Sequence, residues 1–440
     1  MDTYANSLKK TLTSLIREMS AAPAPYVKNP EKDFTRKKKL PFETVMQLLI
    51  SMGGNSIYKE LLESQGYDVN TATTSAFVQQ RNNILPSAVE FLFHAFTQSY
   101  ADIKCYRGYR LLAVDGSDLH IATDSEETDT YFQSQPNTKG FNLLHLNAAY
   151  DLCNRLYVDA LVQPRRLWNE GRALATMVDR SPIKGKTIVI ADRGYESYNN
   201  FAHIERKGWN YVIRVKDLES NGILSGLRLP TSGAFDWDVH LTLTKKQTKA
   251  VKARPEMYKF VPSTSTFDFL DLQENLFYPI SFRVVRFVLP SGAYETVITN
   301  LSAADFPPDE IKSIYNMRWG IETSFRALKY TVGLTHLHAK RQESIVQEIF
   351  ARMIMYNFAE MKTSHVVISK MDKRHSYQVN FTVAVHVCRH FLRSRDDEPL
   401  PDVEALIRKN ILPIRPIRPG QKNTRKIRSK SVVSFVYRVA

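Results

Sequence analysis

The chain has 440 residues, and 60 Lys and Arg against 45 Asp and Glu leave a formal net charge of +15, which favours a polyanionic partner without excluding a basic protein that has none. Hydrophobic residues make up 43% of the sequence and aromatic residues 11%, enough for a folded core, so wholesale disorder is excluded. No stretch approaches the roughly 18 consecutive apolar residues of a membrane helix, and Cys105, Cys153 and Cys388 are too scattered for a disulfide framework.

The first hundred residues show helical periodicity. Leu8, Leu12 and Leu15 lie on one face of a predicted helix over residues 7–20, and the prolines that follow end it. Further helices are predicted over 42–52, 75–82 and 86–100. We therefore predict an all-α N-terminal domain over residues 1–104.

Strands and helices alternate after Tyr109. Short apolar runs predict strands over 111–114, 143–150, 155–162, 187–191 and 210–215, and helices are predicted over 169–180 and 198–207. Three strands followed by alternating helices and strands indicate a mixed sheet with helices packed on it. The predicted fold class is therefore α/β.

Residues 216–300 interrupt this alternation. Apolar and polar residues alternate from Phe235 to Thr244, which predicts a strand with Trp237 on its buried face. A hairpin is predicted over 281–300. We thus predict a β-rich insertion over 216–300, within a core formed by residues 105–215 and 301–365.

The C-terminal part is predicted to be helical and then strongly basic. A long helix opens at Pro307-Pro308 and ends near Gly333, and a second covers about 343–361. Residues 366–440 are predicted to form a helical region followed by a basic tail. No acidic residue follows Ala405, and nine Lys and Arg lie between Arg408 and Lys430, which favours contact with phosphates.

Two aspartates follow predicted apolar strands. Asp115 comes after Leu111–Val114, and Asp192 comes after Thr187–Ala191. Ligands of such sheets collect beyond the strand ends, so both carboxylates are expected in one crevice. Because Asp-Gly also begins ordinary turns, neither aspartate alone decides between a turn and a site.

A third acid lies on the long helix opened by Pro307-Pro308. Tyr315, Arg318, Glu322 and Lys329 have offsets of 0, 3, 7 and 14 residues, which places them within an arc of roughly 60° on an α-helix. This stripe favours a functional face. An ordinary ion pair between Arg318 and Glu322, four residues apart, is the competing interpretation.

These motifs resemble a known family. Tyr315-x2-Arg318-x3-Glu322-x6-Lys329 is similar to the Y-R-E-K signature of bacterial insertion-sequence transposases of the insertion sequence 4 family. Val114–Ser117 and Ala191–Tyr195 look like the first and second acidic motifs of that family, and the resemblance covers roughly residues 33–360. It implies a DDE transposase with an RNase H-like catalytic core, interrupted by a β-strand insertion between the second Asp and the Glu.

Asp115, Asp192 and Glu322 form a site of oxygen ligands without Cys or His, which suits Mg²⁺ or Mn²⁺. Two such ions would activate a nucleophile and stabilise the leaving oxygen in an in-line phosphoryl displacement. The resemblance implies the order of steps. Water first releases a 3′-hydroxyl at the transposon end, and that hydroxyl then attacks the opposite strand or target DNA.

Several other residues are candidates for DNA contact. Tyr315, Arg318 and Lys329 are expected to hold the backbone near the cut. The N-terminal candidates are the basic residues Arg36, Lys37 and Lys38, and Gln79 and Arg81, which are expected to be exposed on a major-groove helix. A helix that only packs in a domain that reads no sequence is an equal alternative for residues 73–81. Trp237 is a candidate for stacking a flipped base, against ordinary core packing, and Trp168, Trp209 and Trp319 stay open.

The expected partners are double-stranded DNA of transposon ends and target, and a second copy of the chain, because two ends must be held together. No membrane partner is expected. The N-terminus has no basic segment followed by an apolar run, which favours the cytoplasm and its nucleoid. An RNase H-fold nuclease that does not join strands, and an inactive DNA-binding derivative of a transposase, remain alternatives.

Overall fold

The computed structural model describes residues 3–36, 38–133, 135, 137–218, 220–366, 368, 376–394 and 399–414. They form two compact units. The first unit comprises the described parts of residues 1–103, 118–144 and 324–440, and the second those of 104–117 and 145–323. None of the helices in these described ranges combines the length and the apolar character needed to cross a bilayer.

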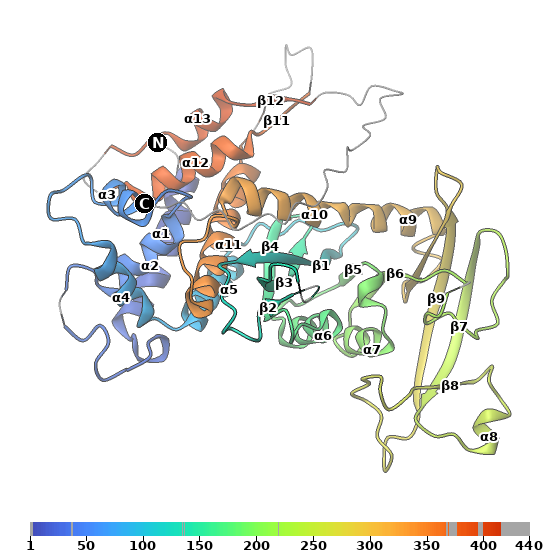
Figure 1. Ribbon diagram of the computed structural model, residues 1–440. Helices are drawn as coiled ribbons and strands as arrows, with labels where there is room; N and C mark the ends of the chain where they lie inside the picture. Colours follow the sequence, from blue (N-terminus) through green and yellow to red (C-terminus); the bar gives the residue numbers. More distant parts are fainter. Residues whose placement is uncertain are drawn as a thin grey trace. The chain divides into compact units, whose positions relative to one another are not determined.

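The first unit is built around helix α11 (Gln342–Ser364), most of whose side chains are buried. Helices α1 (Thr3–Ala21), α2 (Phe42–Ser51), α5 (Pro86–Gln98) and α12 (Phe381–Arg393) pack against it (Figure 1). α1 buries Leu8, Leu12 and Ile16, which recur at intervals of four residues and so share one face. The predicted helices of this region are therefore present.

Shorter elements complete the first unit. They are η1 (Ala24–Tyr26), α3 (Ile57–Ser64), α4 (Thr74–Asn82), α13 (Val403–Lys409), and the paired strands β11 (Tyr377–Gln378) and β12 (Leu412–Pro413). α3 was not predicted from the sequence. Its eight residues bury only Glu60 and Leu61, so its apolar periodicity is too short to be distinctive.

The strands form one mixed sheet. Its order is β2-β3-β1-β5-β6-β10-β9-β7-β8, with β4 paired to β3. β1, β5 and β6 are parallel neighbours, whereas β6, β10, β9 and β7 follow one another in antiparallel pairs. The bounds are β1 (Arg110–Ile121), β2 (Tyr131–Phe132), β3 (Phe141–Asp151), β4 (Leu156–Pro164), β5 (Thr187–Ala191), β6 (Asn210–Val215), β7 (Phe235–Thr244), β8 (Tyr258–Phe260), β9 (Tyr278–Val288) and β10 (Tyr294–Thr299).

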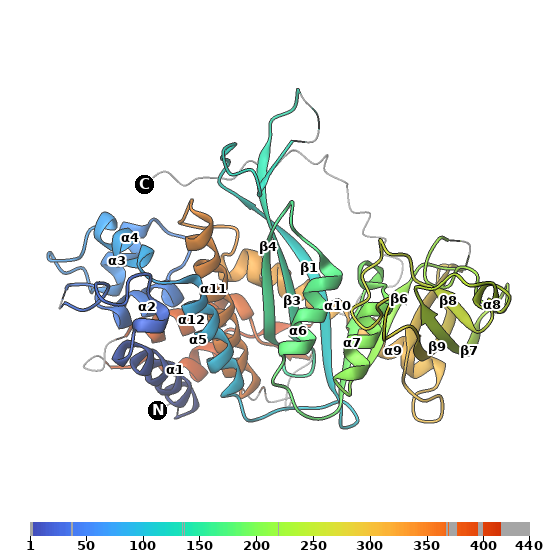
Figure 2. The same ribbon diagram turned by 90° about the horizontal axis from the view of Figure 1, so that it is seen from below.

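Helices cover both faces of the sheet in the second unit. Along β5, Val189 and Ala191 pack with helices α6 (Glu170–Arg180) and α7 (Tyr198–Arg206), which lie side by side in Figure 2. Ile188 and Ile190 belong to a separate core with α9 (Pro308–Met317). Because successive strand residues point to opposite faces, this fully apolar strand supplies both cores. The predicted mixed α/β arrangement is confirmed.

The strands of residues 216–300 extend this same sheet. β10 pairs with β6, from Thr296↔Val215 to Thr299↔Val212, and β9 and β7 follow outward. The short elements α8 (Lys249–Lys252) and β8 were not predicted. The expected burial of Trp237 is wrong, because its side chain is 48% exposed. On the same face of β7, Val239 belongs to the core cluster and Phe235 packs against it, so Trp237 is an exposed position between two packed residues.

Candidate active site

Asp115 and Asp192 lie at matching positions on two neighbouring parallel strands. The register of β1 and β5 pairs Val114 with Ala191, so the next residue of each chain segment is an aspartate. Asp192 directly follows β5, as predicted, and caps the short 3-10 helix η2 (Arg193–Tyr195). The prediction that Asp115 follows its strand is wrong, because β1 continues to Ile121 and only its burial decreases at Asp115.

Tyr315, Arg318 and Glu322 face these two aspartates. The Tyr315 hydroxyl lies 3.5 Å from Asp192 Oδ1. Arg318 Nη2 donates to Glu322 Oε1 at 2.9 Å, and its Nη1 lies 3.9 Å from Asp115 Oδ2. The ion pair between Arg318 and Glu322 is therefore present, but the same guanidinium also faces Asp115. One buried arginine thus connects the helix acid with a strand acid.

The helix that carries these groups departs from a continuous α-helix. α9 ends at Met317, Arg318 keeps helical angles (φ −49°, ψ −34°), and α10 (Trp319–Arg326) continues the chain. The π-helix η3 (Ala327–Val332) follows and ends at Gly333, which adopts φ 95°. A π-turn is wider than an α-turn, so the predicted 60° arc does not describe Lys329. Lys329 belongs to the first unit, where its Nζ donates to the Asp118 carbonyl at 2.9 Å.

The carboxyl of Asp115 is electrostatically strained. Burial, the largest cause, and the nearby Glu322 and Asp192 carboxylates together raise its pKa from 3.8 to about 6, although the Gly116 N–H and Arg318 act in the opposite direction. Burial alone would lower the pKa of Arg318, but Tyr315 and the surrounding acids raise it above its usual value. Like charges are therefore gathered around a single buried guanidinium, an arrangement typical of functional sites.

Arg214 is a second cation of the site, which the sequence did not reveal. It lies on β6, the next parallel strand, and its Nε is 2.5 Å from Asp192 Oδ1 while its Nη2 donates to Oδ2 at 2.9 Å. The same side chain pairs with Glu295 on β10 at 3.3 Å. In the sequence, Arg214 is a charged residue between the apolar residues Ile213 and Val215 of β6. This position was a weak signal that the arginine has a partner at the sheet.

Glu170 brings a fourth carboxylate to the two strand ends. A Cβ added at Gly116 would meet its Oε1 at 2.9 Å, and a Cβ at Gly194 would meet its Oε2 at 2.6 Å. His145 Nε2 lies 3.3 Å from Glu170 Oε1. The sequence analysis missed Glu170, although a glycine one or two residues after each aspartate was a signal that another group approaches the backbone there.

The four tryptophans differ in exposure. Trp209 is buried at 4% exposure, whereas Trp168, Trp237 and Trp319 are 37%, 48% and 59% exposed. The Arg318 guanidinium lies 5.2 Å from the Trp319 ring centroid. Trp319 is therefore an exposed aromatic residue directly beside the acids, while Trp237 lies on β7 of the same unit.

The N-terminal candidates fall into three groups. Arg36, Lys38 and Gln79 are exposed, and Lys37 lies outside the described residues. The prediction that Arg81 is exposed is wrong, because the residue is 2% exposed and its Nη1 donates to Glu348 Oε1 at 2.7 Å. α4 thus uses Arg81 to join α11, and Gln79 on its outer side is the accessible polar group. The part of the basic tail beyond residue 414 also lies outside the described residues.

The acids fit a hard divalent cation by their chemistry. Within the described ranges, no three His, Cys, Asp or Glu side chains are close enough together to hold a metal ion. Arg318 and Arg214 hold Glu322 and Asp192 apart from a shared centre. Asp115 is the exception, a half-buried carboxylate whose Oδ2 is as far as 3.9 Å from the nearest Arg318 nitrogen. A bound divalent cation would neutralise the Asp115 carboxylate, which has no closer positive partner among the described residues. Carboxylate oxygens are ligands that Mg²⁺ and Mn²⁺ prefer, so the residues fit either ion.

Comparison with known proteins identifies the family. Residues 106–358 match the family model of the transposase DDE domain. The chain belongs to this family. DDE transposases are metal-dependent enzymes that cleave DNA, and the matched segment contains both aspartates, Glu322 and Glu170.

Other comparisons add little. A cryo-EM structure of the piggyBac transposase synaptic complex with hairpin DNA is similar at 10% sequence identity, covering 93% of this chain and 82% of that chain, with a TM-score of 0.49. A TM-score below 0.5 carries no weight for the fold or function of this transposase. None of the curated proteins matches the chain.

Proposed function

We propose that this DDE transposase belongs to the insertion sequence 4 family and moves an insertion sequence by cutting and pasting DNA. It binds the terminal inverted repeats, cleaves at the transposon ends and transfers the strands to target DNA. Tyr315, Arg318, Glu322 and Lys329 fill every position of the Y-R-E-K signature. The RNase H-like core with its β-rich insertion is part of the same proposal.

The observation that carries the proposal is the convergence of Asp115, Asp192 and Glu322 in the second unit. The first two follow Val114 and Ala191 in the β1–β5 register, and Arg318 connects Glu322 to Asp115. We assign these three carboxylates as the catalytic acids and as the ligands of Mg²⁺ or Mn²⁺. When bound, two such ions supply Lewis-acid stabilisation of the charge on the transferring phosphoryl group.

The remaining side chains hold the DNA. Arg318 and Tyr315 lie among the acids and are assigned to phosphates next to the cut, where a guanidinium provides two parallel donors. As a metal ligand, Glu322 would no longer pair with Arg318, whose guanidinium would then be available to the DNA. Lys329 is assigned to the DNA backbone near the cut by its position in the Y-R-E-K signature. For a flipped base, the exposed Trp319 beside Arg318 is a better stacking candidate than Trp237.

A cleavage and joining assay on end DNA tests this function. Glu322→Gln is expected to lower metal-dependent cleavage by at least about a thousandfold, because a preorganised charge contributes several kcal/mol to such a transition state. Binding of end DNA in EDTA should stay within about twofold. Asp309→Asn, which alters an exposed acid on the preceding helix, is the matched control and should cleave normally.

Strand joining separates the proposal from its alternatives. A pre-cleaved end with a free 3′-hydroxyl is expected to join target DNA in the wild-type protein. Cleavage without joining would identify a nuclease, and end binding without either reaction would identify an inactive derivative. The proposal further predicts a dimer on paired ends, detectable as one protein–DNA complex that holds two end fragments of different length.

A further inference from the structure

One face of α12 carries basic side chains far from the motifs of the active site in sequence. His386, Arg389, His390 and Arg393 occupy positions i, i+3, i+4 and i+7, so they share one stripe of the helix. Ala384, Val385, Cys388 and Phe391 form its buried apolar side. Apolar packing therefore accounts for one side of α12 and leaves the basic stripe to be explained.

This stripe lines a cavity of about 360 Å³ in the first unit. The other lining residues come from the end of α3, the turn after it and the end of α12, and they are Glu63, Ser64, Gly66, Tyr67 and Ser394. His386 and His390 are exposed, while Arg389 and Arg393 are only partly exposed. The histidines thus lie nearer to solvent than the two guanidinium groups.

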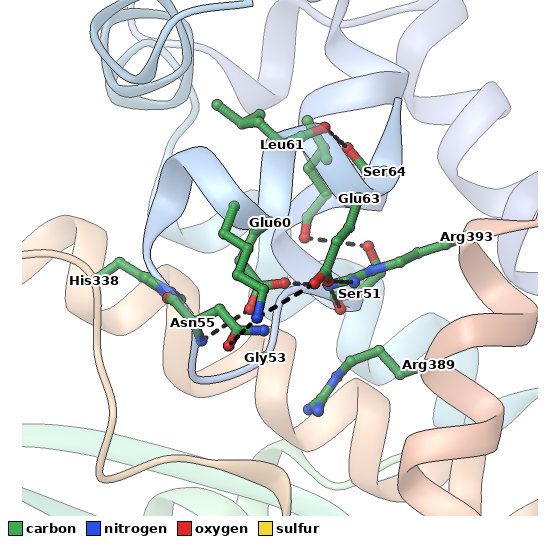
Figure 3. Close-up of polar contacts among 12 residues, drawn as sticks. Ser51, Gly53, Asn55, Glu60, Leu61, Glu63, Ser64, His338, Arg389 and Arg393 are labelled. Carbon is green, nitrogen blue, oxygen red and sulfur yellow. Dashed lines mark hydrogen bonds and ion pairs between the residues drawn. The ribbon is translucent and has the colours of Figure 1, made fainter. Parts of the chain in front are cut away.

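Both terminal nitrogens of the Arg393 guanidinium contact the protein, as Figure 3 shows, and only its buried Nε has no hydrogen-bond partner. Its Nη1 donates to Glu63 at 2.7 Å, and its Nη2 donates to the Ser51 carbonyl at 2.7 Å and also contacts Glu60. Glu63 is therefore held by Arg393 and does not neutralise a second arginine. The charge of Arg393 is satisfied within the protein.

Arg389 has no such counterion. Its Nη2 donates to the Val332 carbonyl at 3.0 Å. Among the described residues, no carboxylate lies within 4.0 Å of its guanidinium, and its buried Nε has no hydrogen-bond partner. Burial lowers the pKa of Arg389 to about 9, and repulsion from Arg352 and Arg393 contributes to this shift.

The charge count of the surrounding cluster leads to the same residue. Four guanidinium groups share three carboxylates, and the members are Arg81, Arg352, Arg389, Arg393, Glu60, Glu63 and Glu348. Arg352 also lacks a carboxylate partner among the described residues, but it is 1% exposed and does not line the cavity. The excess positive charge is therefore open to a ligand at Arg389, because Arg393, which also lines the cavity, is paired with Glu60 and Glu63. A buried charge without a counterion is costly, and an anion in the cavity would remove that cost.

We propose that this cavity binds a phosphate group, with Arg389 as its main donor and His386 and His390 at its rim. A guanidinium offers parallel donors that match two phosphate oxygens. The same chemistry can come from the DNA backbone or from free inorganic phosphate. The net charge of +15 favours the DNA backbone. This inference goes beyond the proposed function, because binding at Arg389 requires neither the acidic triad nor a metal.

The first test is thermal unfolding of the full chain in EDTA, with inorganic phosphate titrated against chloride at constant ionic strength. Phosphate is expected to raise the melting temperature of the wild-type protein and of the control Lys249→Gln, which removes an exposed charge from α8. Arg389→Gln should lose this shift. It should not melt earlier in phosphate-free buffer, because it removes a charge that has no counterion.

The second test identifies the source of the phosphate through the salt dependence of binding to duplex DNA. If Arg389 contacts the backbone, Arg389→Gln lowers the slope of log K against log salt by about 1, whereas Arg389→Lys preserves it. Loss of the phosphate shift with an unchanged slope would also support the cavity, with free phosphate as its ligand. Should Arg389→Gln fail to fold, replacing both exposed rim histidines, as in His386→Ala/His390→Ala, should reduce the rise in melting temperature that phosphate causes.

Two outcomes overturn the proposal. The first is a wild-type melting temperature that does not respond to phosphate, or an Arg389→Gln variant that responds equally. The second is a phosphate-dependent rise in melting temperature that appears only in the triple variant D396N/D397N/E398Q. That result would mean that acids following α12 in the sequence, and not phosphate, neutralise Arg389 in the wild-type protein. Because both tests are done in EDTA and measure binding, failure of the proposed catalytic function would not affect them.

Discussion

Arg318 donates a 2.9 Å hydrogen bond to Glu322, one turn further along the helix, and its other Nη lies 3.9 Å from Asp115. A simple intrahelical ion pair would leave the strands unaffected. Here the side chain of Arg318 is 5% exposed and lies between acids from two elements of the site. Its charge therefore sets the protonation of the strand acid as well as the position of the helix acid.

Arg318→Gln is expected to lower cleavage at least tenfold and to shift the acidic limb of the pH–rate profile upward. Arg318 lowers the pKa of Asp115, so its removal leaves Asp115 protonated at higher pH. The measurement is cleavage rate against pH at saturating Mg²⁺. Arg326→Gln, an exposed arginine at the end of α10, should keep the wild-type profile. If the acidic limb does not move in Arg318→Gln, Arg318 interacts with Glu322 but does not affect the pKa of Asp115.

Asp115→Asn should stabilise the protein in the absence of metal above about pH 6. Its folded-state pKa is raised from 3.8 to about 6, so the stability that protonated Asp115 contributes is present below 3.8 and lost as the pH rises through 6. A tenfold difference in proton affinity corresponds to about 1.4 kcal/mol, so a rise in pKa from 3.8 to about 6 predicts a gain of about 3 kcal/mol at pH 8.

Urea unfolding in EDTA at about pH 4 and pH 8 measures this effect. The difference between variant and wild type should nearly vanish at the lower pH, where both side chains are neutral. Equal stability at both pH values would show that the Asp115 carboxylate is adequately neutralised by Arg318. Excess Mg²⁺ at pH 8 should reverse the order, because only the wild-type acid can bind the cation.

The glycines beside the aspartates should differ in their tolerance of a methyl group. In Gly116→Ala, the new Cβ would meet His145 Nε2 at 2.3 Å, on a ring that is buried. In Gly194→Ala it would meet the Glu170 carboxylate at 2.6 Å, at the end of a flexible side chain. We expect a loss of about 2–3 kcal/mol for Gly116→Ala and about 1 kcal/mol for Gly194→Ala.

A double-mutant cycle tests whether the Glu170 side chain causes the loss of stability in Gly194→Ala. Glu170→Ala should largely restore the stability of Gly194→Ala and should not rescue Gly116→Ala, where the His145 ring remains in place. Denaturant unfolding of the three single variants, the two double variants and the wild type provides the free energies. If Glu170→Ala leaves the cost of Gly194→Ala unchanged, the close approach of Glu170 to Gly194 is not the reason for the glycine.

Substitutions of Arg81 and Gln79 on α4 should affect different properties, protein stability for Arg81 and DNA recognition for Gln79. Arg81→Met leaves the buried Glu348 without its nearest cation, and breaking such a pair costs about 3–5 kcal/mol. Gln79→Ala removes an exposed side chain and should change stability by less than about 0.5 kcal/mol. If α4 reads the transposon end, Gln79→Ala weakens binding to end DNA relative to random DNA. Equal binding to both would leave α4 a packing helix.

The sequence predicted features that depend on local pattern. The run Thr187–Ala191 is apolar throughout, which indicated a buried strand and placed Asp192 at its end. The ion pair between Arg318 and Glu322 was predictable because residues four apart are neighbours on any regular α-helix. Even the end of the long helix at Gly333 followed from the tolerance of glycine for a left-handed conformation.

Features that depend on distant partners were not predictable in this way. Arg81 looks like a surface residue until α11 places Glu348 beside it, 267 positions later. Glu170 belongs to no motif and reaches Gly116 and Gly194 only because α6 packs on the sheet. The π-turn at Lys329 has no periodic signal, so the helical wheel was continued past the point where it applies.

The pairing of β10 with β6 determines whether the segment 216–300 can be removed. A module attached by a flexible linker can be deleted without harm to its host. Here deletion would turn β6 into an edge strand with unpaired backbone groups and uncovered Ile213 and Val215. Such an edge readily pairs with other chains. A shortened transposase made in this way would therefore aggregate rather than act as a minimal catalytic core.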